Sequence, residues 1–135
     1  MKDSDDLELA LSGYRGRVLL VDVFDVYDST FPDLVGERIA LHDRLAGRPF
    51  DLVGLCASRS TLPGARSAFE KLGITWRCGL PQGMGHPYIV SLFASSKPPT
   101  TILVDAQGVI RARGRPFAEM ARLAEELTAD AERGG

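Results

Sequence analysis

Two nearly continuous apolar runs dominate the hydrophobic pattern of this chain. Residues 17–24 read Arg-Val-Leu-Leu-Val-Asp-Val-Phe, and residues 50–56 read Phe-Asp-Leu-Val-Gly-Leu-Cys. Short runs of this kind, rich in valine and leucine, are typical of strands that are buried on both faces of a sheet. We therefore predict that residues 17–24 form a buried central strand and that residues 50–56 form a second buried strand.

Helical spacing of apolar residues marks three other segments. The pattern predicts a helix over residues 34–45, ended by Gly47, and another over residues 62–72, ended by Gly73. A stretch rich in Ala, Glu, Leu and Arg predicts a terminal helix over residues 117–131, with the last three residues of the chain frayed.

The remaining pattern predicts shorter elements. These are strands over residues 7–11 and 74–78, a loop over 79–86, a brief helix over 87–93, and a hairpin of residues 100–105 with 109–113. The order of strands and helices predicts an α/β fold with a central mixed β-sheet flanked by helices on both faces. We expect residues 1–135 to form a single domain, with its core spanning about residues 7–131.

Composition narrows the class of function. The chain has 135 residues, of which 44% are hydrophobic and 25% charged, as is ordinary for one globular domain. A net charge of -2 argues against nucleic-acid binding and against attraction to a membrane surface, because both need a dominant basic face. The first six residues are acidic and polar, unlike a secretory signal, so we expect a cytoplasmic protein unless an export signal was removed.

Three blocks, in order along the chain, resemble the thioredoxin-like redoxins of the TlpA/ResA type and, more loosely, the AhpC/TSA type. Residues 16–22 read Gly-Arg-Val-Leu-Leu-Val-Asp, residues 50–55 read Phe-Asp-Leu-Val-Gly-Leu, and residues 99–105 read Pro-Thr-Thr-Ile-Leu-Val-Asp. The resemblance covers roughly residues 7–128 and implies a thioredoxin-like fold. It also implies a cis-proline at Pro99, before the hairpin. Many relatives of this type are exported.

The chain departs from the family where its chemistry lies. At the family's Cys-x-x-Cys positions this sequence has Asp28 and Phe31. In the register of the peroxiredoxin branch, with Thr30 as the motif threonine, the cysteine position is held by Asp33. Neither register supplies the thiolate that disulfide exchange or peroxide reduction needs. The resemblance therefore implies a degenerate redoxin that lacks dithiol-disulfide chemistry at this site.

Three residues are candidates for acid–base catalysis in a repurposed enzyme: Asp22, Asp28 and His86. Each also has a structural interpretation. Asp28 lies where it would cap the following helix, and His86 would be exposed on a loop. Asp22 matches the family's buried acid beneath the active site, and a neighbour or a water would satisfy it.

A binding role is the leading hypothesis, because a protein can keep the surface that docks a ligand after it has lost its catalytic thiols. The resemblance places that face at Tyr27, Phe31, Pro98, Pro99 and Thr100, for an unknown protein or small-molecule ligand. We expect no cofactor and no metal, since two histidines, two cysteines and scattered aspartates do not form a ligand pattern.

Cys56 and Cys78 end two strands that we expect to be parallel neighbours. If their side chains point the same way, they would form a relocated redox pair. The other interpretation is two small buried thiols in a reducing cytosol. Separately, Arg111, Arg113 and Arg115 alternate along the last predicted strand and suggest a solvated edge that discourages pairing between sheets. A site for phosphate or an acidic partner is the less favoured alternative for these arginines.

Overall fold

A computed structural model describes residues 15–24, 31–56, 67, 70–76, 78–79 and 100–134 of the chain. Its strands are β1 (Val18–Phe24), β2 (Phe50–Cys56), β3 (Cys78–Gly79), β4 (Thr100–Val104) and β5 (Ile110–Arg113). Its two long described helices are α1 (Phe31–Arg44) and α4 (Phe117–Gly134).

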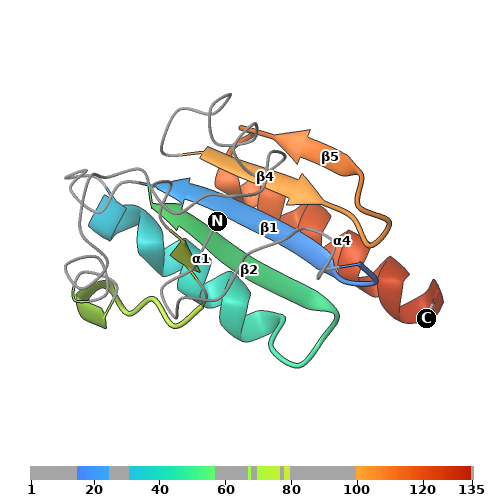
Figure 1. The fold of residues 1–135 in the computed structure, drawn as a ribbon, viewed down its shortest axis with the longest axis horizontal. Helices are drawn as coiled ribbons and strands as arrows, with labels where there is room; N and C mark the ends of the chain where they lie inside the picture. Colours follow the sequence, from blue (N-terminus) through green and yellow to red (C-terminus); the bar gives the residue numbers. More distant parts are fainter. Residues whose placement is uncertain are drawn as a thin grey trace.

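The five strands form one mixed sheet in the order β3-β2-β1-β4-β5 (Figure 1). Strands β1, β2 and β3 run parallel, whereas β4 and β5 are each antiparallel to their neighbour. The β1–β2 register runs from Val18 opposite Phe50 to Phe24 opposite Cys56. Apart from Arg17, every residue of the two long apolar runs therefore lies within a central strand pair, as the sequence predicts.

Helices α1 and α4 pack against one face of this sheet. The apolar cluster there joins Val18 and Leu20 of β1 with Leu41 of α1 and Met120 of α4. In Figure 1 strands β1 and β4 pass in front of α4. The opposite face is equally well covered, because Leu19, Val21, Val23, Val53 and Ile102 are at most 2% exposed. The mixed α/β fold is confirmed.

Some element boundaries differ from those predicted. Helix α1 begins at Phe31, three residues before the predicted start. Pro32 is tolerated there because backbone N–H groups in the first turn of a helix have no intrahelical acceptor, and the Asp33 carboxylate complements the helix dipole. The predicted strand over residues 74–78 is wrong in its extent, since β3 contains only Cys78 and Gly79. Ile74 and Trp76 are buried in the apolar cluster without belonging to a strand.

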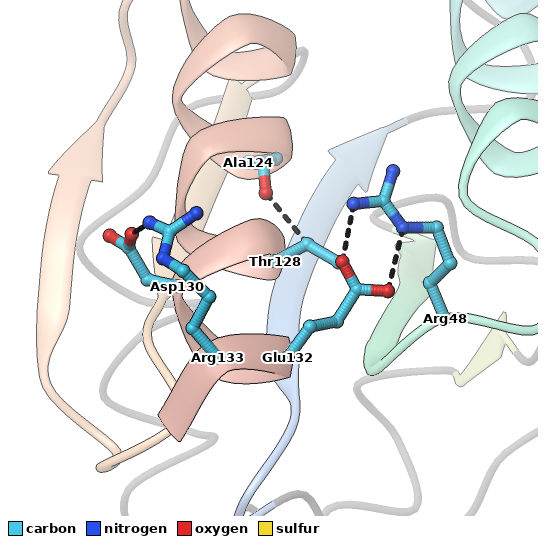
Figure 2. A network of polar contacts seen from close by, with 6 residues as sticks. All are labelled: Arg48, Ala124, Thr128, Asp130, Glu132 and Arg133. Atoms are coloured by element: carbon cyan, nitrogen blue, oxygen red, sulfur yellow. Dashed lines mark hydrogen bonds and ion pairs between the residues drawn. The ribbon is translucent and has the colours of Figure 1, made fainter. Parts of the chain in front are cut away.

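Helix α4 continues to Gly134, three residues beyond the predicted end at residue 131. Side-chain contacts stabilise this last turn (Figure 2). Arg48 donates two hydrogen bonds to the Glu132 carboxylate, at 2.6 and 3.1 Å, and Arg133 pairs with Asp130. Thr128 donates its hydroxyl to the Ala124 carbonyl at 2.7 Å. Bidentate arginine–carboxylate contacts have the geometry that makes an exposed ion pair effective.

Several predicted elements lie wholly or partly outside the described residues. They are the strand over residues 7–11, most of the loop over 79–86, the brief helix over 87–93 and most of the helix over 62–72. Of the last, Glu70 to Leu72 are helical, and Gly73 follows with a φ of 79°. That left-handed conformation fits glycine as the residue that ends a helix. No helix in the described ranges is long and apolar enough to cross a membrane.

Candidate functional site

Asp22 is a carboxylate in the middle of the sheet, near the carboxyl end of β1. It lies opposite Gly54 of β2 and Thr101 of β4, and its side chain is fully buried. A charged group in such a place costs several kcal/mol unless a partner compensates for the lost hydration. The question for the site is therefore what this carboxylate contacts.

Its partner is Arg38, which projects from the second turn of α1. The Arg38 Nε donates to Asp22 Oδ2 at 3.1 Å, and Nη1 donates to the Leu34 carbonyl at 3.2 Å. The guanidinium also lies 4.3 Å from the centroid of the Phe117 ring. The Arg38 side chain is only 5% exposed. Arg38 thus links the sheet to both helices that cover this face.

Sequence reasoning missed Arg38, although the chain carried a signal. Leu34, Val35, Arg38 and Leu41 recur at helical spacing, so the arginine occupies a position on the apolar stripe of α1. A cation on a buried helical face needs an acid opposite, and Asp22 was already singled out as a buried acid. Combining those two observations would have predicted the ion pair.

Burial governs the ionisation of Asp22. Desolvation raises the pKa of the Asp22 carboxyl above its ordinary value of 3.8, while the charge and hydrogen bond of Arg38 act in the opposite direction. The second oxygen, Oδ1, has no hydrogen-bond partner among the described residues. The carboxylate is enclosed and already bonded, so this arrangement favours a structural role for Asp22 over acid–base catalysis on a substrate.

The other predicted site residues are only partly described. Tyr27, Asp28, His86, Pro98 and Pro99 lie outside the described residues, so their predicted catalytic and binding roles stay predictions. For two more, the structure gives the backbone. Phe31 is the first residue of α1, and Thr100 begins β4 opposite Val23 of β1. The register therefore places the start of β4 beside the end of β1, as the resemblance implies.

The two cysteines lie on neighbouring strands, as predicted, but they are offset along them. Cys78 is opposite Gly54, so Cys56 lies two residues further along β2. That offset, combined with one strand spacing, separates the two Cα atoms by about 8 Å. A disulfide needs Cα atoms within roughly 7 Å. The register therefore does not favour a Cys56–Cys78 disulfide without movement of the backbone.

A pocket lies next to the ion pair, between the first turns of α1 and α4. Its volume is about 360 Å³, and Arg38, Thr101, Arg115 and Phe117 are among its lining residues. Within the described ranges, no group of three or more His, Cys, Asp or Glu side chains is arranged to hold a metal ion.

Strand β5 is the exposed edge that its alternating arginines predict. Arg111 and Arg113 are exposed, whereas Ala112 between them is buried. Arg115 continues the pattern beyond the strand and is also exposed. Arg111 also contacts the Asp105 carboxylate at 3.3 Å. The interpretation as a solvated, charged sheet edge is confirmed.

The strand order, the helices on the sheet and the buried acid of β1 together define a thioredoxin-like fold. Solved structures confirm it. The chain is similar to a thiol-disulfide oxidoreductase from Bacteroides fragilis, with a TM-score of 0.77 and 21% identity, covering 94% of this chain and 95% of that one. No protein-family profile and no curated protein sequence matches the chain.

Two further structures show the same likeness. The thioredoxin domain of a thiol-disulfide oxidoreductase from Bacteroides vulgatus gives a TM-score of 0.76 at 18% identity, with 94% of this chain and 90% of that one covered. A thiol:disulfide interchange protein of the thioredoxin family from Chlorobium tepidum gives 0.74 at 18% identity, with coverage of 95% and 91%. Identities this low establish the fold and leave the activity to be argued from the residues.

Proposed function

We propose that this thioredoxin-fold protein has no dithiol-disulfide activity and binds a protein or small molecule at the face where its redox relatives carry their thiols. The buried Asp22–Arg38 pair is the observation that supports this most. In the family that the chain resembles, the equivalent acid assists proton transfer to a thiol. Here that carboxylate is bonded to an arginine, and the two thiol positions hold Asp28 and Phe31.

These two changes fit together chemically. A proton-transfer group must exchange its proton with a reacting partner, whereas the Asp22 carboxyl is enclosed and bonded to a guanidinium, which keeps its own protons. Without a thiol there is no proton for Asp22 to transfer. The acid is then free to serve as an anchor for α1, which positions the start of that helix at the proposed binding face.

A thiol oxidoreductase that uses Cys56 and Cys78 is the second candidate. Solved structures that are similar to this chain are described as thiol-disulfide oxidoreductases, and β2 and β3, which carry the two cysteines, are adjacent parallel strands. The two-residue offset between the cysteines counts against it. Because the two candidates differ in the state of these thiols, chemistry can separate them.

Thiol trapping tests the proposal. The protein is exposed to oxidised glutathione, denatured and alkylated with iodoacetamide, with or without prior reduction by a phosphine, and its intact mass is measured. We expect no intramolecular disulfide, because the register holds the cysteines too far apart. The Cys56→Ser variant, which cannot form the pair, is the matched control. A wild-type mass that lacks both carbamidomethyl groups and two hydrogen atoms relative to the phosphine-reduced sample, with no such species in the control, would establish the second candidate.

A further inference from the structure

The pocket between α1 and α4 has the dimensions of a ligand site. Its volume of about 360 Å³ falls within the range of roughly 300–1,000 Å³ that is usual for small-molecule sites. The nine lining residues come from three parts of the fold, which are the first two turns of α1, the start of β4 and the connection from β5 into α4. They are Leu34, Glu37, Arg38, Thr101, Gly114, Arg115, Pro116, Phe117 and Ala118.

Three charged side chains belong to the pocket wall. Arg38 and Arg115 contribute two guanidinium groups, and Glu37 is the one carboxylate among the lining residues. Arg38 is buried and fixed by Asp22 and Leu34, so it is already oriented before any ligand arrives. Arg115 is exposed and makes no ion pair with any carboxylate that the structure describes. The Asp22 carboxylate offsets the charge of Arg38, so Arg115 is the adaptable cation that an anion entering the pocket would meet.

The same wall offers apolar surface beside these charges. The Phe117 ring lies against the Arg38 guanidinium, and Leu34, Pro116 and Ala118 complete an apolar side. Pro116, Phe117 and Ala118 also surround the first turn of α4, where the positive end of the helix dipole has the same sign as the arginines. A ligand that suits both surfaces has one negative group and a flat, apolar body.

We propose that this pocket binds a small organic carboxylate with a planar apolar body. The carboxylate would accept hydrogen bonds from Arg115, since a guanidinium matches the two oxygens of a carboxylate. The apolar body would pack on Phe117 and Leu34. This site goes beyond the proposed binding face, because none of the predicted face residues belongs to its lining.

Benzoate and its neutral isostere benzamide serve as probes in a titration followed by the backbone amide spectrum of the ¹⁵N-labelled protein. We expect saturable shifts at Gly114, Phe117 and Ala118 with benzoate, and a Kd about tenfold weaker with benzamide, because it lacks the charge-assisted hydrogen bonds. Equal binding of the two probes, or no saturable shift at these amides, would overturn the proposal.

Two substitutions of exposed residues refine the test without disturbing the core. Arg115→Gln should weaken benzoate binding about tenfold and leave benzamide unchanged, whereas Glu37→Gln should strengthen benzoate binding. Arg122→Gln is the matched control, since Arg122 is another exposed arginine of this region, on α4 outside the pocket lining. An equal loss in Arg115→Gln and Arg122→Gln would contradict a specific site. Thiol trapping is independent of these results, so the two proposals fail separately.

Discussion

Arg38→Met is expected to lower the free energy of unfolding by about 3–5 kcal/mol at neutral pH. Arg38 is the described ion-pair partner of the fully buried Asp22 carboxylate, and methionine fills part of the space without supplying a donor. The variant also loses the contact with the Phe117 ring and the hydrogen bond to Leu34. Urea unfolding followed by circular dichroism measures the change.

The double variant Asp22→Leu/Arg38→Met separates the cost of an unpaired charge from the cost of lost packing. Replacing both members of a buried ion pair with apolar residues is often neutral or stabilising. We therefore expect the double variant to recover most of the stability that Arg38→Met loses. If the double variant is as unstable as the single one or less stable, the ion pair is not the reason for the loss.

The pH dependence of the unfolding free energy provides a second test of the Asp22–Arg38 ion pair. Burial raises the pKa of the folded Asp22 carboxyl above its ordinary value of 3.8, so the folded state holds this proton more tightly than the unfolded state. The stabilising contribution of that proton is complete below the unfolded pKa and is lost as the pH rises through the folded pKa. Removing Arg38 should raise the folded pKa further and extend this loss to higher pH. Asp22→Asn in the Arg38→Met background should abolish this part of the pH dependence.

Leu19→Ala and Leu20→Ala should each cost about 2–5 kcal/mol of unfolding free energy. The two leucines are neighbours on β1 and point to opposite faces of the sheet, and they are 2% and 0% exposed. Leu20 belongs to the apolar cluster beneath α1 and α4, whereas Leu19 faces the other side. Similar losses of unfolding free energy in the two variants would therefore indicate that both faces of the sheet are covered. Urea unfolding of the two variants gives both values.

Val109→Ala is the control for this pair, because Val109 is 55% exposed and its truncation should change stability by less than about 0.5 kcal/mol. A small cost for Leu19→Ala beside a large cost for Leu20→Ala would contradict a sheet that is buried on both faces. It would also contradict the thioredoxin-like architecture, in which the central strands are covered on both sides.

The central strands were predictable because their apolar runs are long and are interrupted by a charged residue only at Asp22 and Asp51. The hairpin was predictable as well, since the turn around Gly108 is a short-range signal and Gly108 has a φ of 86°. Helix α4 was predicted from its composition, but its last turn depends on Arg48, which is 84 residues away from Glu132. No local pattern contains such a contact.

The candidate site was predictable only in those features that depend on single positions, and not in its long-range contacts. The sequence placed an acid at position 22 and showed two non-cysteine residues at the thiol positions, and both are properties of single positions. The Asp22–Arg38 contact joins a strand to a helix, and Phe117 reaches Arg38 from 79 positions further along the chain. At Ile74 and Trp76 the local pattern predicts a strand that the structure does not contain. Their alternation around an exposed Thr75 imitates a strand, although tertiary packing alone buries them.

The reduction of insulin disulfides by dithiothreitol tests most directly whether this thioredoxin-like protein lacks the chemistry of the redoxins it resembles. The wild-type protein is compared with the Cys56→Ser/Cys78→Ser double variant at equal concentration, after circular dichroism has shown that both are folded. We predict that neither protein accelerates the reaction over dithiothreitol alone. Acceleration by the wild type that the double variant lacks would contradict the account, because it would show that these two cysteines perform dithiol-disulfide exchange.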